Sequence, residues 1–237
     1  MNAAALLNGI TRENVSRYVV QRLHEGRSIA QANIDLLEIG GHRFVLKDFR
    51  GHNILVRNLW GRRIIARETR LYRHLKGIEG IPRVLKQLDP FAFIMEYGEG
   101  SCIRHRRENG LTAEFFDRLK SVVAAMHERG VTHGDLRRKN IIVTPEKHPL
   151  LIDFAGAFCL KGRGNFLTRA IFDRLKNVDN LTVLKLQNMM LPGTLTPEEA
   201  RRLASVPWFL RLGRFLKKKI YRPFKHATRK RRNEEQK

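Results

Sequence analysis

The sequence predicts a mixed α+β fold in which a β-rich N-terminal part precedes a mainly helical part and a basic amphipathic tail. Three observations predict this order. Residues 17–49 contain short apolar runs of β-forming residues with Gly40 and Gly41 between the last two runs. Residues 115–126 instead carry apolar side chains at helical spacing. Residues 201–237 hold 14 Lys or Arg and two Glu, so the end of the chain is strongly basic.

Composition and charge narrow the function classes. The 237 residues are 42% hydrophobic, enough to bury the core of one two-lobed domain or two small ones. Lys and Arg number 46 against 23 Asp and Glu, which gives a formal net charge of +23. Such a charge favours phosphate-bearing partners, namely nucleotides, nucleic acid, anionic lipid or phosphorylated sugars.

Cysteine usage and the N-terminus indicate a cytoplasmic protein. Cys102 and Cys159 lie far apart in the sequence and form no CxxC pair, which argues against a disulfide framework or a thiolate metal site. No basic segment precedes the short apolar run near residue 5, and no segment approaches the ~18 apolar residues that a membrane span needs. Peripheral contact with the inner membrane face, through the tail, is a further option.

The first half of the sequence predicts strands followed by one helix. The Gly40–Gly41 pair supplies the positive φ that a tight hairpin needs, which puts Lys47 on the following strand. Residues 63–75 change to helical spacing, with Glu68 in the middle. Another strand is expected over 92–97, followed by a glycine-containing linker at 98–100.

The second half predicts helices around a short hairpin. Thr112 can cap a helix whose buried stripe is formed by Phe115, Leu119, Val122 and Met126 and which ends at Gly130. Short strands at 141–143 and 150–152 should pair and bring Asn140 near Asp153. Residues 170–190 are expected to be helical. Thr196, Pro197 and Glu199 form a capping box that begins another helix.

The chemistry is concentrated in two short segments. "HGDLRRKN", residues 133–140, and "LLIDF", residues 150–154, place two carboxylates and a carboxamide on loops that flank the predicted hairpin. Phosphoryl transfer needs groups that hold nucleotide phosphates, bind metal ions and orient an acceptor hydroxyl. The two segments therefore favour an enzyme that uses ATP and Mg²⁺.

The set and order of these motifs resemble the protein-kinase-like superfamily over roughly residues 18–180. The resemblance is to its small atypical bacterial members, of the RIO type or similar to lipopolysaccharide kinases. It implies a bilobal fold with a small β-rich N-lobe at 1–97, a truncated, mainly helical C-lobe at 98–206 and a basic tail at 207–237.

Within the N-lobe the resemblance implies a nucleotide site. "VLKDF" resembles the strand whose lysine holds the α and β phosphates, which makes Lys47 the phosphate ligand. Glu68, 21 residues later, matches the helix glutamate that pairs with this lysine. "FIMEYGEG" resembles the hinge, so Met95 would line the back of the adenine pocket. The backbones of Glu96 and Gly98 would then bind the base.

In the C-lobe the resemblance assigns the catalytic and metal groups. Asp135 corresponds to the residue that orients the acceptor hydroxyl and accepts its proton, and Arg137 to the phosphate-contacting position. Asn140 and Asp153 correspond to the ligands of Mg²⁺. Asp179 matches the helix aspartate that braces the catalytic loop, and His133 is expected to brace that loop more than to act as a base.

Two departures from the family pattern bear on nucleotide binding. The segment "LHEGRSIAQAN" falls where a glycine-rich loop is expected, yet it contains only Gly26 as a candidate for covering the phosphates. Ala155 replaces the glycine that follows the metal-binding aspartate and phenylalanine.

The tail has two open interpretations. Trp208, Leu212, Phe215, Leu216 and Ile220 recur at helical spacing with Arg and Lys between them. Such a helix can pack on the body or lie on an anionic membrane surface.

Three hypotheses for function remain. The first is an ATP-dependent kinase acting on a protein serine or threonine or on itself, with a lipopolysaccharide core sugar as the alternative acceptor. The second is a nucleotide-binding pseudokinase scaffold. The third is an RNA-associated protein, for which the sequence offers no base-reading motif, so nucleic acid is the least favoured partner.

Overall fold

The structure is a computed structural model, and it describes residues 3–26, 31–50, 57–103, 110–160, 162 and 164–205. The chain forms two compact units, Met1–Thr194 and Leu195–Lys237. The first unit contains the N-terminal sheet and the helices that carry the site. The predicted lobe boundary near residue 97 falls inside this unit, and the division into lobes and tail stays a prediction.

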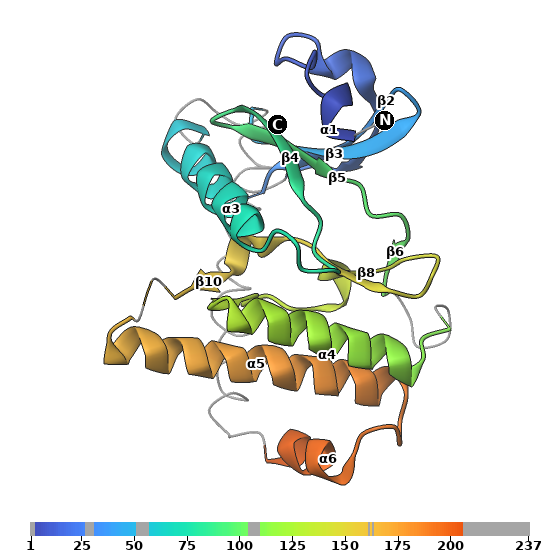
Figure 1. The fold of residues 1–237 in the computed structure, drawn as a ribbon, viewed down its shortest axis with the longest axis vertical. Coiled ribbons are helices and arrows are strands. Elements are labelled where there is room, and N and C mark those ends of the chain that lie inside the picture. The colour runs from blue at the N-terminus through green and yellow to red at the C-terminus, as the bar shows by residue number, and fades with distance from the viewer. Residues whose placement is uncertain are drawn as a thin grey trace, which may run out of the picture. The chain divides into compact units, whose positions relative to one another are not determined.

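A five-stranded sheet forms the N-terminal part of the first unit, in the spatial order β1-β2-β3-β5-β4 (Figure 1). Every neighbouring pair is antiparallel. Gly40 and Gly41, at φ of 58° and 77°, make the predicted tight turn between β2 and β3. The strands are β1 (Val19–His24), β2 (Asn33–Ile39), β3 (His42–Asp48), β4 (Val84–Asp89) and β5 (Ala92–Glu96).

The two faces of this sheet are covered by different segments, because side chains alternate along a strand. Phe44 and Leu46 of β3 face a cluster that includes Leu7 and Ile10 from the start of the chain. This starting segment contains the short helices α1 (Ala3–Leu6) and η1 (Val15–Tyr18). Val45 of β3 belongs to the larger core on the other side. Lys47 is two residues further along, on the same face as Val45.

Helix α3 (Arg62–His74) follows the single-turn η2 (Arg57–Gly61) and matches the predicted helix at 63–75. Its buried face consists of Ile65, Glu68, Thr69, Leu71 and Tyr72. Glu68 is thus one of the few charged side chains buried on this helix, at 1% exposed. A buried carboxylate needs a positive partner, and that partner comes from the sheet.

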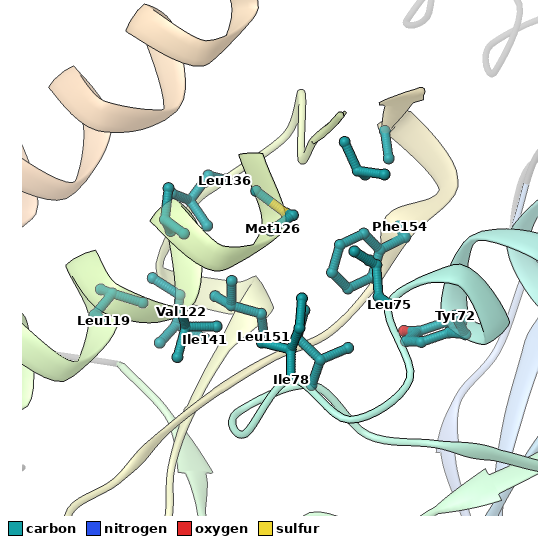
Figure 2. Close-up of a cluster of buried hydrophobic side chains, with 14 of the residues drawn as sticks. Tyr72, Leu75, Ile78, Leu119, Val122, Met126, Leu136, Ile141, Leu151 and Phe154 are labelled. Atoms are coloured by element: carbon teal, nitrogen blue, oxygen red, sulfur yellow. The ribbon is translucent and has the colours of Figure 1, made fainter. Parts of the chain in front are cut away.

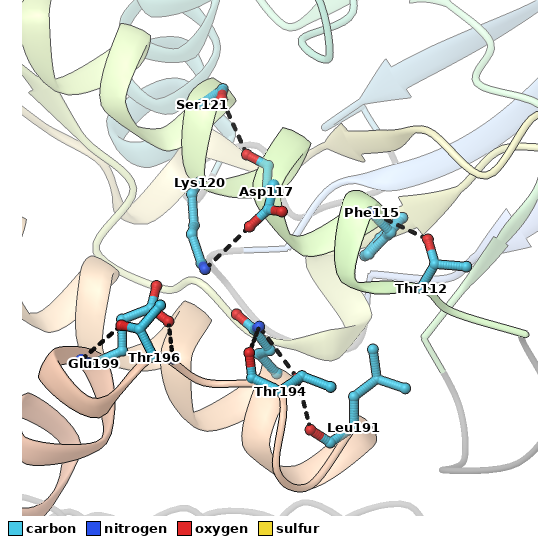
Figure 3. Close-up of polar contacts among 10 residues, drawn as sticks. Thr112, Phe115, Asp117, Lys120, Ser121, Leu191, Thr194, Thr196 and Glu199 are labelled. Carbon is cyan, nitrogen blue, oxygen red and sulfur yellow. Dashed lines mark hydrogen bonds and ion pairs between the residues drawn. The ribbon is translucent and has the colours of Figure 1, made fainter.

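Two long helices, α4 (Ala113–Glu128) and α5 (Phe166–Met190), form the helical part and run side by side (Figure 1). Thr112 caps α4 as predicted, its hydroxyl accepting a hydrogen bond from the Phe115 N–H at 3.3 Å (Figure 3). The predicted stripe of Phe115, Leu119, Val122 and Met126 is buried. Helix α5 begins four residues before the predicted position, because Asn165 caps it through the Thr168 N–H.

Short strands and turns connect these helices and carry the polar groups of the site. As predicted, β8 (Ile141–Val143) and β9 (Pro149–Leu151) form a hairpin, and β6 (Ser101–Cys102) extends it to three strands. A separate pair joins β7 (Val131–Thr132) to β10 (Phe158–Cys159). Two single turns lie at the ends of the two motif segments, namely η3 (Arg138–Asn140) and η4 (Phe154–Gly156).

One hydrophobic core joins the sheet to the helical part (Figure 2). Tyr72, Leu75 and Ile78, from α3 and the segment after it, pack in the same cluster as Leu119 and Phe154. The two parts are therefore held in contact by apolar burial as well as by the polar groups of the site.

The second unit is described only through α6 (Pro197–Ala204), which has the predicted capping box. The Thr196 hydroxyl accepts from the Glu199 N–H at 3.2 Å, and the Glu199 carboxylate accepts from the Thr196 N–H at 2.9 Å (Figure 3). The predicted amphipathic tail at 207–237 lies outside the described residues. Within the part of the chain that the structure describes, no helix combines the length and apolar character needed to cross a bilayer.

Substitution of Leu119 by Ala tests the central packing of α4. Leu119 is fully buried in the shared core, so the change should lower the free energy of unfolding by about 2–5 kcal/mol through lost burial and a residual cavity. Leu167→Ala is the matched control, because Leu167 is 66% exposed. Chemical denaturation of both variants measures the difference, and equal losses would contradict this packing.

Candidate functional site

Lys47 and Glu68 form a buried ion pair, as the sequence predicted. The Lys47 Nζ lies 2.7 Å from each carboxylate oxygen of Glu68, and its side chain is 11% exposed. The same nitrogen lies 3.6 Å from the Asp153 carboxylate. Strand β3, helix α3 and the segment after β9 thus meet at one ammonium group.

Burial and charge act in opposite directions on this pair. Burial lowers the pKa of Lys47, but the negative charges of Glu68 and Asp153 outweigh it, so the net pKa of the lysine is raised. Burial raises the pKa of Glu68, and the ammonium offsets that only in part. The lysine therefore carries its positive charge at neutral pH, where nucleotide phosphates are anionic.

Asp179 of α5 holds the backbone of the loop at residues 133–140, which is called the catalytic loop here after its predicted role. Its carboxylate accepts hydrogen bonds from the N–H groups of His133, at 2.7 Å, and Gly134, at 3.3 Å. It is 1% exposed and also lies 3.2 Å from His127 Nε2 of α4. Both helices are thereby tied to the loop. The bracing role predicted for Asp179 agrees with this geometry.

His133 is placed to brace the loop. The ring is fully buried, and its Nε2 lies 3.1 Å from the carbonyl of Ile152. A carbonyl can only accept, so Nε2 carries the proton of this bond. The ring connects the segment before Asp135 to the segment before Asp153, which favours the structural role over the role of a base.

The position between His133 and Asp135 requires glycine for two structural reasons. Gly134 adopts a φ of 70°, and a Cβ at this position would lie 2.4 Å from the carbonyl oxygen of Gly156. Any side chain would force the catalytic loop and the turn after Asp153 apart. The glycine thus permits the close approach of the two motif segments.

Within the catalytic loop, the side chain of Asn140 is hydrogen-bonded to the backbone of Asp135. The Asn140 amide nitrogen donates to the Asp135 carbonyl at 2.9 Å, which leaves the amide oxygen as the acceptor of that side chain. The Ile152 N–H donates to the Asn140 carbonyl at 3.0 Å, so Asn140 lies beside the Asp153 segment. Arg137 approaches the Asp135 carboxylate at 3.0 Å.

Asp153 is held in an unusual backbone conformation, with φ of 68° and ψ of 72°. A non-glycine residue in this region costs about 1–3 kcal/mol and persists only when its surroundings fix it. Its N–H donates to the hydroxyl of Tyr72 at 3.1 Å. The buried Phe154 ring packs against the Tyr72 ring, with 5.1 Å between the two ring centroids. Burial raises the pKa of Tyr72 well above its ordinary value, so the hydroxyl stays neutral.

A second residue of α3 connects this helix to the same segment. The Arg67 guanidinium donates to the carbonyl of Ala157, four residues after Asp153. Arg67 and Tyr72 were both missed by sequence reasoning. Tyr72 lies four residues after Glu68 and so on the same side of the helix, but the sequence carries no signal that Arg67 or Tyr72 contacts a segment about 80–90 residues away.

The predicted base-binding segment lies at the end of β5. Met95 is buried, and the Glu96 N–H donates to the Arg83 carbonyl at 3.0 Å. The Glu96 carboxylate is bound by Arg83, accepting from its N–H at 2.8 Å and from its Nε at 2.6 Å. A Cβ on Gly98 would lie 2.0 Å from Cδ2 of Leu150, so any other residue here would make the Leu150 side chain shift. Because the Glu96 N–H is already bonded, the predicted adenine contacts would use the Glu96 carbonyl and the Gly98 N–H.

Gly26 lies between β1 and β2, where a phosphate-covering loop would be. Its N–H donates to the Asn33 side chain at 2.9 Å, and a Cβ would lie 2.2 Å from the Gln31 carbonyl. The absence of a side chain at Gly26 therefore allows its backbone to approach Gln31 and Asn33 closely. Residues 27–30 are outside the described part, and a nucleotide role for Gly26 stays a prediction.

The donor set fits magnesium better than a tightly caged transition metal. Over the residues that the structure describes, no three His, Cys, Asp or Glu side chains gather to hold a metal ion. Mg²⁺ commonly takes only one or two protein ligands and completes its shell with water and substrate phosphates. The Asp153 carboxylate, 41% exposed, and the Asn140 amide oxygen could supply such ligands.

The site sequence also matches known proteins. Residues 103–159, which include the catalytic loop and Asp153, match the phosphotransferase enzyme family. The fold, the Lys47–Glu68 pair and this match agree. Together they support a protein-kinase-like superfamily for this chain.

Curated protein kinases are similar to parts of this kinase-like chain. Serine/threonine-protein kinase cds1 of Schizosaccharomyces pombe is 29% identical over 100 residues, covering 40% of the chain and 22% of that protein. CBL-interacting serine/threonine-protein kinase 13 of Arabidopsis thaliana is 26% identical over 144 residues, covering 58% and 25%. The interferon-induced, double-stranded RNA-activated protein kinase of Rattus norvegicus is 33% identical over 66 residues, covering 28% and 13%. The chain thus spans a quarter or less of each relative's length.

Replacing Arg67 by Ala should loosen the segment that carries Asp153. A hydrogen bond from a charged donor contributes about 1.5–3 kcal/mol, so nucleotide affinity in the presence of Mg²⁺ should fall about tenfold. Arg70→Ala, on the exposed side of the same helix, is the control and should bind normally. Isothermal titration with a non-hydrolysable ATP analogue measures both. Equal affinity for the two variants would argue against the contact with Ala157.

The raised pKa of Lys47 in this kinase-like site predicts a specific pH dependence. Because the folded-state pKa lies above the ordinary 10.5, the stabilisation from the ammonium is fully present below that pH. It is lost only as the pH rises through the higher folded-state value. The difference in unfolding free energy between wild type and the double variant Lys47→Met, Glu68→Gln, which removes both buried charges together, should therefore stay constant from neutral pH to about pH 9. A difference that changes within this window would mean that burial dominates and the lysine is partly neutral.

Proposed function

We propose that the chain is an ATP-dependent kinase that transfers the γ-phosphoryl group to a hydroxyl acceptor. One observation carries the proposal: the Lys47 ammonium lies 2.7 Å from Glu68 and 3.6 Å from Asp153. These residues come from separate parts of the chain, and the resemblance to the protein-kinase-like superfamily had assigned all three to one site. A charged amine facing an acidic metal ligand is the arrangement that nucleotide phosphates require.

The nucleotide would bind between the sheet and the catalytic loop. Lys47 would contact the α and β phosphates, with Glu68 holding the amine in position. The base would lie against Met95 and hydrogen-bond to the backbones of Glu96 and Gly98. Asn140 and Asp153 would hold Mg²⁺, which when bound neutralises charge on the β and γ phosphates.

The acceptor would meet the γ phosphate at Asp135. The carboxylate can accept the hydroxyl proton, and the loop beneath it is fixed by the two hydrogen bonds to Asp179. Arg137, 3.0 Å from Asp135 and largely exposed, is placed to attract the anionic phosphoryl group as it is transferred.

A protein serine or threonine, or the chain itself, is the proposed acceptor. The three similar proteins named above are protein kinases, which supports this choice over a lipopolysaccharide core sugar. The presence of every predicted catalytic side chain in one connected arrangement favours an enzyme over a pseudokinase scaffold. The proposed cytoplasmic location, and contact of the tail with an anionic membrane, rest on the sequence alone.

Substitution of Asp135 by Asn tests the reaction. Loss of a positioned proton acceptor typically costs about 10²–10⁴-fold in rate, so phosphotransfer should fall by that factor while ATP still binds. Asp117→Asn, on an exposed site of α4, should keep full activity. Radiolabel transfer with Mg-ATP, assayed against protein, lipopolysaccharide and no added acceptor, measures rate and acceptor together.

The same assay distinguishes the alternatives. Label in protein supports the proposed acceptor, whereas label only in glycolipid would replace it with the sugar. Nucleotide binding without transfer to any acceptor, equal in wild type and Asp135→Asn, would support the scaffold and sink the kinase proposal.

A further inference from the structure

Helix α3 exposes a side that carries arginines and no acidic side chain. The helix contains five arginines and one carboxylate, and that carboxylate, Glu68, is buried against Lys47. At 100° per residue the arginines fall within an arc of about 140°, opposite the five buried residues of the helix. All five arginines are exposed. We call this side the α3 face, and it is formed by Arg62, Arg63, Arg67, Arg70 and Arg73.

Other helices of the chain offset their surface arginines with acids one turn away. Arg118 of α4 lies 2.8 Å from Glu114, and Arg202 of α6 lies 2.9 Å from Glu198. On the α3 face, positions one turn apart instead hold like charges, such as Arg63 and Arg67. The first turn of α3 also lacks an acid beside the positive end of the helix dipole. The stability of the helix alone does not account for this arrangement, whereas an anionic partner would.

Contacts with neutral groups hold several guanidinium groups at this surface. Arg67 donates to the carbonyl of Ala157, and the Arg62 guanidinium lies 6.0 Å from the centre of the Phe91 ring. At the C-terminal end of the helix, Arg129 donates to the carbonyls of His74, at 3.1 Å, and Lys76, at 2.6 Å. Such contacts fix the positions of these guanidinium groups without removing their charge.

An exposed aromatic ring lies at the start of the α3 face. Trp60, in the single turn η2, is 59% exposed. It precedes Arg63 by three residues and so lies within about one turn of the arginines. Surfaces that bind single-stranded nucleic acid combine these two groups, because guanidinium groups contact the phosphates and an aromatic ring stacks on a base.

We propose that the α3 face and Trp60 form a binding surface for single-stranded nucleic acid. The arginines would contact successive phosphates, and Trp60 would stack on a base. Arg63, Arg67 and Arg70 follow one another at about 4.5–6 Å along the helix axis, which is wider than the roughly 3.4 Å per nucleotide of a duplex strand. An extended single strand can match this spacing. The proposal does not depend on the proposed kinase activity.

The composition of the α3 face favours nucleic acid over other anionic partners. Ala66 is the only apolar residue within the arc, so the arginines have no large apolar side chain among them to insert into a bilayer. The core of a protein interface is depleted in charged residues, whereas this face consists of them. The cations are all arginine, whose guanidinium binds phosphate through two parallel hydrogen bonds. Nucleic acid was the least favoured partner on sequence grounds, but the sequence does not reveal that Trp60 is exposed beside these arginines.

The fluorescence of Trp60 tests this surface separately from the basic tail. Trp208→Phe leaves Trp60 as the only tryptophan of the full chain. Titration with an oligouridylate of about 12 nucleotides, without ATP, should quench the emission because a base stacks on the indole ring. Anisotropy of the same oligonucleotide carrying fluorescein gives the affinity, and Trp60→Ala should weaken binding about tenfold.

Removal of two arginines tests the phosphate contacts. The double variant Arg70→Gln, Arg73→Gln should bind about tenfold more weakly, and its slope of log affinity against log salt should be about 1.4 smaller, since each lost contact to a single strand contributes about 0.7. The double variant Arg17→Gln, Lys185→Gln removes the same charge from exposed sites on other elements and should bind like the wild type. Thermal unfolding of both variants should match the wild type, because all four side chains are exposed.

Two results would overturn the proposal. Equal affinities of the two double variants, or a Trp60 emission that the oligonucleotide leaves unquenched, would assign binding to the tail or to the overall charge. A blue shift of Trp60 with phosphatidylglycerol vesicles, without quenching by the oligonucleotide, would assign the α3 face to a membrane instead.

Discussion

A lysine ammonium that is largely removed from water must have carboxylates close to it. In this protein the carboxylates that pair with Lys47 determine how the elements of the candidate site are arranged. Leaving such a charge unpaired would cost several kcal/mol, far more than a surface ion pair contributes. Glu68 satisfies the requirement from helix α3, and Asp153 does so from the segment after β9. Three elements that are distant in sequence thus meet at one atom, and separating β3 from α3 would leave a buried charge without its 2.7 Å partner.

The opposite side of the site is held by backbone contacts. Asp179 binds two consecutive N–H groups of the catalytic loop, and His133 links that loop to the Ile152 carbonyl. Gly134 removes the side chain that would separate the loop from Gly156. Apolar packing of Tyr72 and Phe154 completes the connection to α3. The side chains of the candidate site are therefore positioned by buried contacts on both sides, which is the kind of support that the proposed phosphoryl transfer would need.

The parts of this arrangement that were predictable from sequence are those with local signals. The Gly40–Gly41 turn placed Lys47 on a strand, Thr112 marked the start of α4, and the hairpin after Asn140 placed Asp153 near it. Strand β4 was not predicted, because Lys86 and Gln87 interrupt its apolar pattern and its pairing with β5 supplies the missing stability. The start of α5 was placed too late, since Phe166 and Leu167 lie exposed and outside any buried stripe.

The contacts of Arg67 and Tyr72 were not predictable for a different reason. Each joins positions about 80–90 residues apart in the chain, and no local pattern distinguishes these side chains from others on a basic amphipathic helix. Ala157 comes to lie beside Arg67 only through the packing of α3 against the segment after Asp153. The resemblance to a family indicated which residues bear the chemistry, whereas the packed fold determined what supports them.

The most direct test of the central claim is a crystal structure of the full chain with Mg²⁺ and a non-hydrolysable ATP analogue. The account predicts phosphates against the Lys47 amine, with the metal ion held by Asp153 and Asn140 and the Glu68 contact retained. A nucleotide bound elsewhere, or a Lys47 side chain directed away from both Glu68 and the phosphates, would contradict it.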